Sequence, residues 1–531
     1  MSQHYIFPKL RVLWWRGICN QLMLLIFLLV LHVGASSPAP ADSDHLQEAA
    51  ELMRAGDLKG AEGEAKLAIS DPSTRPLALS ILGAIRVREK HYAEAAEFLH
   101  AALRLKPGLV PAQLTLAQAY LQTGKPLLAK KEFNNVLHLD PNNREARFGI
   151  SKLECASGDF RASLSEAEPI LDELRHSADG VVLLAKDYAG LKNKNSIIGL
   201  VRDWAVLPET SADSIVEFAS ILEKSDLNQQ ALEVLEEAKN RGTVSYEMAF
   251  ALGNLYFSNG DVNSAFQSYE AALSLSPGCP DCLLQLAKIA SQQKDPEKAL
   301  AYLIRAKRER PKDPAILFEF GKACLELDLP DDALAALQEA ARLQPNNDSY
   351  AYVLASANVS KKQYAVAGKL FQSLLAKHPD DPVLNYAMGS LLFLEVKFDE
   401  AKTYLERSVK LQPGQTAAYY YLGLIAEGKG DNNQAALTFR NLLQRNPAYG
   451  PAWEGLGRVL LNQKQFPEAQ QALEKAVALD PGSVKAHYQL GILLGRTGRP
   501  TDSSKEFEIV QQLNAEEQKR LGMRLRILSP H

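Results

Sequence analysis

A 34-residue period in the placement of proline and small residues constrains this chain more than any other feature of its sequence. The period places proline seven times in succession, at Pro277, Pro311, Pro345, Pro379, Pro413, Pro447 and Pro481. Small residues recur at the eighth and twentieth positions of each period and a large apolar residue at the twenty-fourth, as in Gly457, Ala469 and Leu473. Such a period is typical of a chain that stacks small units instead of folding around one core.

Fourteen of these units fit residues 42–517 without an insertion. They start at residues 42, 76, 110, 144, 178, 212, 246, 280, 314, 348, 382, 416, 450 and 484. The units that start at 144, 178 and 212 are degenerate, because Arg175, Glu209 and Thr243 replace the proline. The period therefore predicts one array of units, whereas a length of 531 residues alone would suggest about three or four globular domains.

Each unit is expected to form two antiparallel helices. In residues 450–483, Trp453, Leu456 and Leu460 have helical spacing, and Pro481 ends the second helix and orders the start of the next unit. Small residues at the eighth and twentieth positions would let the two helix axes approach closely. Helices short enough for two to fit in a 34-residue unit are marginally stable alone. We therefore expect each pair to be stabilised by burial against the next pair.

This pattern resembles the tetratricopeptide repeat (TPR). The residues that carry the resemblance most closely are Trp453, Leu456 and Gly457, then Tyr419, Leu422 and Gly423, and Leu252, Gly253 and Tyr256. The resemblance implies an all-α fold, a right-handed superhelical α-solenoid of about 14 TPR helix pairs. It also implies a non-enzymatic scaffold that binds partner proteins or peptides, because the family is not an enzyme class.

The charge balance excludes a general nucleic-acid binder. Lys and Arg number 59 against 63 Asp and Glu, a net charge of −4, so no basic excess exists to neutralise phosphates. The sequence contains no His-Glu-x-x-His motif and no phosphate-binding glycine-rich motif. We therefore expect no catalytic residue, no metal and no cofactor, and we interpret Cys155 and Cys324 as packing residues.

Residues 1–35 have the layout of a secretory signal peptide. Lys9, Arg11 and Arg16 precede an apolar run at 22–31, and small residues at its end predict cleavage after Ala35. The run is shorter than the roughly 20 residues of a membrane-spanning helix. We expect an exported protein, periplasmic or secreted; the alternative is an uncleaved membrane anchor with the chain on the extracytoplasmic side.

Short segments flank the array at both ends. We expect residues 36–41 to form a linker between the signal peptide and the first unit. Residues 518–531 carry basic and apolar residues at helical spacing, and they are expected to form a C-terminal capping helix and tail.

In the TPR family, the first helix of each pair lines a concave groove, and its positions 2, 5, 9, 12 and 13 point into that groove. The predicted groove residues at position 5 are Phe148, Phe250, Phe318, Tyr352, Tyr386, Tyr420 and Tyr488. Those at position 9 are Lys152, Lys186, Asn254, Lys288, Lys322 and Arg458, and position 9 contains no carboxylate. Aromatic rings beside cations suit an extended peptide or a polysaccharide. The alternative is that position 5 only packs between neighbouring first helices.

Two specialised TPR sites are absent from the sequence. The carboxylate clamp requires Lys at position 5 and Asn at position 9 of one unit, but the unit with Asn254 has Phe250 at position 5. The asparagine ladder of glycosyltransferase-linked TPR domains lies at position 6, where this chain never has Asn. Neither specialisation therefore identifies the ligand.

Cys279 and Cys282 form a Cys-x-x-Cys motif at the start of the unit at 280. In an oxidising compartment, these two cysteines could close a local disulfide. A thiol redox protein is a remote alternative, because the motif lacks the strand-helix-strand context of the redox enzymes. Zinc binding is disfavoured, because one motif offers only two ligands.

Overall fold

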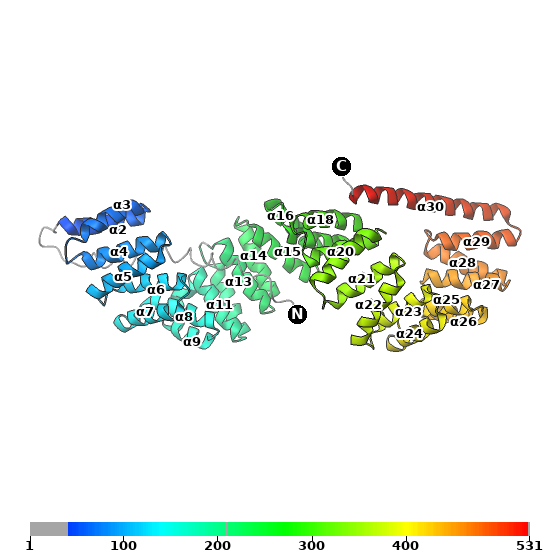
Figure 1. The fold of residues 1–531 in the computed structure, drawn as a ribbon, viewed down its shortest axis with the longest axis horizontal. Helices are drawn as coiled ribbons and strands as arrows, with labels where there is room; N and C mark the ends of the chain where they lie inside the picture. Colours follow the sequence, from blue (N-terminus) through cyan, green and yellow to red (C-terminus); the bar gives the residue numbers. More distant parts are fainter. Residues whose placement is uncertain (1–40, 209, 529–531) are drawn as a thin grey trace. The chain divides into compact units, whose positions relative to one another are not determined.

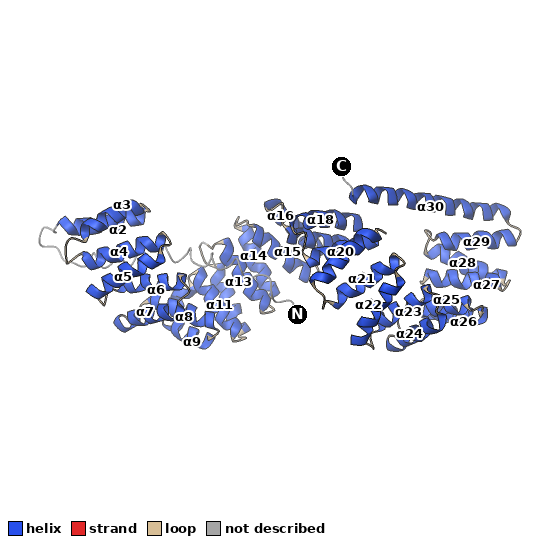
Figure 2. Ribbon diagram, viewed as in Figure 1, coloured by secondary structure: helices blue, strands red, loops and turns tan. Residues whose placement is uncertain are grey.

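The computed structural model describes residues 41–208 and 210–528, and every regular element in these ranges is a helix (Figure 2). The chain divides into an amino-terminal unit, Met1–Asp261, and a carboxy-terminal unit, Val262–His531. The predicted signal peptide, its cleavage after Ala35 and residues 36–40 of the expected linker lie outside the described residues. Among the described residues, no helix combines the length and the apolar character that crossing a membrane requires.

The amino-terminal unit contains the helices α2 to α15, most of which are labelled in Figure 1. Their bounds are α2 (Ala41–Ala55), α3 (Leu58–Ala68), α4 (Arg75–Arg88), α5 (Tyr92–Leu105), α6 (Val110–Gln122), α7 (Pro126–Leu139), α8 (Arg144–Ser157), α9 (Phe160–Ala167), η1 (Glu168–Ile170), α10 (Leu171–Arg175), α11 (Ala178–Gly190), α12 (Lys194–Ala205), α13 (Ala212–Lys224), α14 (Asn228–Asn240) and α15 (Tyr246–Ser258).

The carboxy-terminal unit contains α16 to α30. Their bounds are α16 (Val262–Leu275), α17 (Pro280–Gln292), α18 (Pro296–Glu309), α19 (Pro314–Glu326), α20 (Pro330–Leu343), α21 (Asp348–Ser360), α22 (Tyr364–Lys377), α23 (Pro382–Leu394), α24 (Phe398–Leu411), α25 (Thr416–Gly428), α26 (Asn432–Arg445), α27 (Gly450–Asn462), α28 (Phe466–Leu479), α29 (Val484–Arg496) and α30 (Pro500–Leu528).

First helices begin where the 34-residue period places them. In the carboxy-terminal unit, α17, α19, α21 and α23 begin at Pro280, Pro314, Asp348 and Pro382. Side-chain caps explain several of these starts: Asp313 Oδ1 accepts hydrogen bonds from the amides of Ala315 (2.9 Å) and Ile316 (3.2 Å). Within the amino-terminal unit, and likewise within the carboxy-terminal unit, consecutive helices pack as antiparallel pairs and each pair packs on the next. The prediction of an all-α solenoid is confirmed.

Small residues at the eighth position allow the close helix approach that the sequence predicts. A Cβ atom added at Gly457 would lie 2.5 Å from Cγ of Leu473, and one added at Gly321 would lie 2.5 Å from Cγ of Leu337. The large residue at position 24 therefore fills the space that a side chain at position 8 would occupy.

The turn between the two helices of a pair has one backbone conformation in all 14 of the 34-residue repeats. Its residue at position 15 has a positive φ in each of Gly56, Lys90, Gly124, Gly158, Lys192, Asp226, Gly260, Lys294, Asp328, Lys362, Val396, Gly430, Lys464 and Gly498. Only glycine adopts this left-handed conformation without steric cost. Val396, with φ of 63°, is the one β-branched residue among the 14, and it is 69% exposed.

Replacement of Val396 by glycine is expected to stabilise the carboxy-terminal unit by about 1 kcal/mol, because it removes the steric cost of the left-handed conformation. The reverse change at the matching turn, Gly430→Val, is expected to destabilise the unit by a similar amount. Urea denaturation of both variants measures whether the first raises and the second lowers the free energy of unfolding. Equal effects of the two substitutions would show that the turn conformation is not the cause.

Two parts of the chain depart from the expected pattern. In the degenerate unit at 144, the second helix is interrupted: α9 ends at Ala167, and the 3₁₀ turn η1 and the short α10 follow. Pro169 lies in that turn and has no amide to donate to a continuing helix. At the C-terminus, α30 continues without a break from Pro500 to Leu528, so residues 518–528 extend the last repeat helix and form no separate capping helix.

Candidate partner-binding surfaces

The first helices form the inner face of each stack. Neighbouring first helices contact one another directly, as α23 with α25 and α25 with α27, whereas neighbouring second helices in the carboxy-terminal unit approach each other less closely. The side with the shorter spacing is the concave side of a stack. The predicted groove positions therefore lie on the face that a bound segment would follow.

A cluster of aromatic side chains, the tyrosine surface, lies on this face of the carboxy-terminal unit. It consists of Tyr352, Tyr386, Phe393, Tyr420, Tyr421 and Tyr449. These residues come from α21, α23, α25 and the turn before α27, and all are partly exposed. Helix α23 contains no charged residue, and α21 and α25 contain one each.

Ring contacts connect most of the tyrosine surface across two repeats. Tyr421 lies between Tyr386 and Phe393, with ring centroids 5.9 and 5.2 Å away. Tyr420 contacts Tyr449 at 5.8 Å, with the rings edge to face. Tyr352 instead packs against Phe371 of its own repeat at 5.9 Å. The surface is therefore a packed aromatic platform, with a separate ring at one end.

The phenol oxygens of the tyrosine surface make no hydrogen bond to another group within the described residues, and none is fully buried. Burial of the rings raises the pKa of Tyr386 and of Tyr420 to about 12. Both hydroxyls therefore keep their protons at neutral pH and can donate hydrogen bonds to a ligand.

Phe318 and Lys322 form a neighbouring group on α19. Phe318 stacks on Tyr350 of α21, with ring centroids 4.5 Å apart, and Nζ of Lys322 lies 5.5 Å from the Phe318 centroid. Lys322 also pairs with Glu319 at 2.9 Å. Phe318 is therefore held by Tyr350 and not by Tyr352. The position 5 residues of four consecutive repeats thus do not form one continuous contact; they are Phe318, Tyr352, Tyr386 and Tyr420.

Lys186, Lys322 and Arg458, three of the predicted cations of the groove, pair with carboxylates from other positions. Arg458 on α27 donates two hydrogen bonds to Glu427 on α25, at 2.8 and 2.7 Å, and also pairs with Glu454 of its own helix. Lys186 on α11 pairs with Glu217 on α13 at 2.7 Å. Position 9 itself contains no carboxylate, as the sequence shows, but positions 5, 6 and 12 supply acids that pair with these cations.

The triad of Glu427, Arg458 and Glu454, of which Glu454 is buried and the other two are partly buried, borders the tyrosine surface. Glu454 is only 3% exposed, and burial raises the pKa of its carboxyl group. The hydrogen bonds that Arg458 donates to Glu427 raise the pKa of the arginine above its usual range. The arginine therefore stays charged and holds both acids.

The other predicted groove residues lie on first helices but outside the tyrosine surface. In the amino-terminal unit, Nζ of Lys152 lies 4.8 Å from the ring centroid of Phe148, and Phe250 stacks on Tyr246 at 6.1 Å. Lys288 on α17 and Asn254 on α15 are partly exposed. Tyr488 on α29 packs against Phe507 at 5.7 Å.

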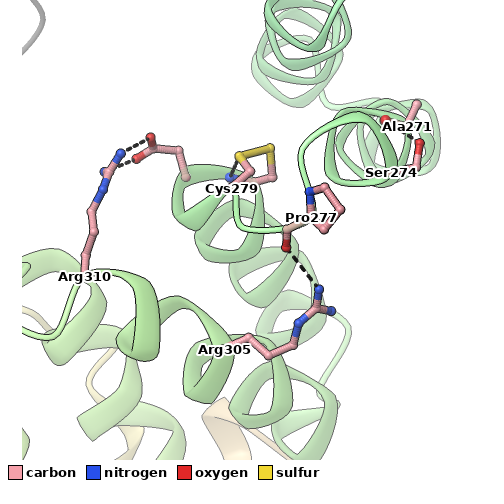
Figure 3. The surroundings of a disulfide bond; sticks show 8 residues. Ala271, Ser274, Pro277, Cys279, Arg305 and Arg310 are labelled. Carbon is pink, nitrogen blue, oxygen red and sulfur yellow. Dashed lines mark hydrogen bonds and ion pairs between the residues drawn. A yellow bond between two sulfur atoms is a disulfide. The ribbon is translucent and has the colours of Figure 1, made fainter.

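Cys279 and Cys282 form a disulfide at the start of α17 (Figure 3). Both residues are buried, and Sγ of Cys279 accepts a hydrogen bond from the amide of Cys282. Next to them, Arg310 binds Asp281 through two hydrogen bonds of 2.8 and 2.9 Å. A disulfide enclosed in this way caps the helix and is poorly placed to exchange with a substrate disulfide.

The two free thiols within the described residues, Cys155 and Cys324, are partly and fully enclosed. Burial raises the pKa of both Cys155 and Cys324 to about 12, so the reactive thiolate is scarce at neutral pH. In the part of the chain that the structure describes, no group of three or more His, Cys, Asp or Glu side chains could share a metal ion.

Comparison with known proteins identifies the family. Residues 86–132, 256–317 and 424–489 match one family model described as tetratricopeptide repeat, and residues 114–173, 217–280, 318–382 and 386–451 match a second model of the same description. Together these segments cover more than half of the chain. The chain belongs to the tetratricopeptide repeat family, whose repeats form protein-interaction scaffolds.

Individual relatives are distant. Cellulose synthase operon protein C of Pseudomonas fluorescens is 22% identical over 484 residues, which cover 79% of this chain and 37% of that protein. The BBSome complex member BBS4 of Bos taurus is 23% identical, over 58% of this chain and 59% of that protein. The chain spans less than two thirds of the length of these relatives. A crystal structure of a tetratricopeptide repeat protein from Parabacteroides merdae is similar with a TM-score of 0.43 and 18% identity, over 47% of this chain and 98% of that one.

Proposed function

We propose that this protein is an exported scaffold that docks uncharged segments of partner proteins on its tyrosine surface. The assembly it serves would belong to an envelope, secretion, pilus or exopolysaccharide system. The signal-peptide pattern of residues 1–35 supports export. The similarity to cellulose synthase operon protein C, over 79% of this chain, supports the exopolysaccharide member of that group.

We infer the kind of partner from the side-chain chemistry of the tyrosine surface. Its central helix, α23, has no charged residue, yet Val383 and Leu394 on that helix are 44% and 42% exposed. Both occupy groove positions of the repeat, beside Tyr386. Exposed apolar side chains beside tyrosine hydroxyls suit an extended segment with apolar anchors and free backbone groups. A charged segment would lose its hydration there without gaining an ion pair.

Partner capture by a triple variant, Tyr352→Ala, Tyr386→Ala and Tyr420→Ala, tests the proposal. We expect the variant to lose at least ten-fold in affinity for a partner recovered with the native chain, because rigid aromatic anchors dominate such interfaces. Tyr404→Ala, on the second helix α24, is the matched control and should retain the partner. Circular dichroism checks that each variant folds.

A second variant separates docking from folding. Val383→Asp with Leu394→Asp places charges at two exposed positions, so it should spare the fold and still abolish capture. Full capture by this folded variant would contradict the proposal. Retardation of the native chain in a gel that contains neutral polysaccharide, lost in the same variant, would instead favour direct polysaccharide binding.

A further inference from the structure

A carboxyl group lies at an apolar position in the core of the amino-terminal unit. Asp187 on α11 occupies position 10 of its repeat and is 0% exposed. In the twelve other units from residue 76 onward, position 10 holds Ala, Val, Leu or Ile, as Ile221 and Leu255 in the next two repeats. An acid at such a position costs stability unless its proton or its partners compensate for the lost hydration.

The hydrogen bonds around Asp187 indicate that its carboxyl group carries a proton. Oγ of Ser163 on α9 lies 2.8 Å from the carbonyl oxygen of Ser151 and 2.6 Å from Oδ2 of Asp187. One hydroxyl proton cannot serve both acceptors. In the repeat at 484, the matching Ser503 donates to the carbonyl of Gly491 at the same 2.8 Å, and the hydroxyl proton is therefore expected to go to the carbonyl in both repeats.

A protonated carboxyl completes this arrangement. When the hydroxyl of Ser163 donates its hydrogen bond to the Ser151 carbonyl, a protonated Asp187 can donate a hydrogen bond to Oγ of Ser163. Oδ1 of Asp187 is buried with no hydrogen-bond partner within the described residues, and such a site suits a neutral oxygen far better than an ionised one.

We propose that Asp187 makes a pH-dependent contact: its neutral carboxyl group joins α11 to α9, and its ionisation loosens the packing of α8, α9 and α11. Asp187 is next to Lys186, a predicted groove residue, so the stability of this part of the inner face would depend on pH.

The polar groups around Asp187 favour its ionised form, but burial outweighs them. Burial is the largest influence and raises the pKa of Asp187 to about 6. Lys186 acts in the opposite direction but is paired with Glu217 of α13. The hydrogen bond from the thiol of Cys155 on α8 also lowers the pKa of Asp187, while burial raises the pKa of that thiol.

The direction of the pH dependence follows from the raised pKa. The folded chain keeps the proton of Asp187 up to about pH 6, whereas an unfolded chain releases it near 3.8. The stabilisation is thus fully present below pH 3.8 and is lost as the pH rises to about 6. The shift of about two pKa units corresponds to about a 100-fold rise in the unfolding equilibrium constant between these limits.

Fluorescence of Trp204 gives a local readout for the test. Trp204 on α12 is buried against Phe218, with ring centroids 4.6 Å apart. In a full-length chain with Trp14, Trp15 and Trp453 replaced by Phe, it would be the sole tryptophan. Urea denaturation of this chain at pH 4.5 and pH 8, with and without Asp187→Asn, measures the pH-dependent difference.

The asparagine side chain can donate to Ser163 as the neutral acid does, but it cannot ionise. We expect Asp187→Asn to remove most of the pH-dependent change in unfolding constant that the parent chain shows. The matched control Asp213→Asn, at an exposed position of α13, should leave that change intact. An equal pH dependence in the parent and in Asp187→Asn would overturn the proposal, as would a loss of stability in Asp187→Asn at both pH values.

Discussion

Gly180→Ala is expected to destabilise the amino-terminal unit by about 3 kcal/mol, because the backbone leaves no room for a side chain there. A Cβ atom added at Gly180 would lie 2.2 Å from the carbonyl oxygen of Leu174 and 2.5 Å from its Cα atom. Both are backbone atoms, so no rotamer change can relieve the clash. The obstruction comes from α10, the short helix that follows the interruption at Pro169.

The control for this prediction is Gly199→Ala on the neighbouring helix α12. A Cβ atom added at Gly199 would meet no atom within 4 Å, and alanine favours the helix by about 0.5–1 kcal/mol over glycine. The two substitutions should therefore have opposite signs in urea denaturation followed by circular dichroism. A neutral Gly180→Ala would show that α10 does not pack against the start of α11 as described.

Arg458→Met is expected to cost about 3–5 kcal/mol in the stability of the carboxy-terminal unit. The change removes the cation that holds Glu427 and Glu454, and it leaves two carboxylates close together in a largely buried site. Methionine retains much of the apolar stem, so the effect would report on charge and not on lost volume.

The compensating variant makes this prediction specific. Adding Glu427→Gln and Glu454→Gln to Arg458→Met removes both unpaired charges and should recover most of the loss. The cost of Arg458→Met alone should also shrink as the pH falls, because burial raises the pKa of Glu454 and its protonation removes one of the two unpaired charges. Thermal unfolding at several pH values measures both effects. A triple variant no more stable than Arg458→Met would contradict the assignment of the triad.

Much of the fold could be predicted from the sequence, because its determinants are local and repeat every 34 residues. Pro314 and Pro382 mark helix starts, and Gly321 and Gly457 mark close helix contacts. The interruption after Ala167 was not predicted, although Pro169 is a visible signal for it. The extent of α30 depends on a choice between one long helix and two short ones, which helical spacing alone does not decide.

The inner face was predicted less well, because it depends on which side chains of neighbouring repeats meet. The contribution of Tyr421 could have been found from the run Tyr419 to Tyr421, and that of Tyr449 only from the folded turn. The pairing of Arg458 with Glu427 joins position 9 of one repeat to position 12 of the one before. Asp187 was visible in the sequence as the only acid at position 10 after the first unit.

Photo-crosslinking from the tyrosine surface tests the central claim most directly. A photoreactive p-benzoylphenylalanine would replace Leu394 on α23 and, as the matched control, Leu411 at the end of the second helix α24; these leucines are 42% and 38% exposed. We predict that Leu394 gives a discrete protein adduct, that the crosslinked peptide is apolar and uncharged, and that Leu411 does not give this adduct. Identical adducts from both positions, or a highly charged crosslinked peptide at Leu394, would contradict the assignment of the tyrosine surface as the docking site.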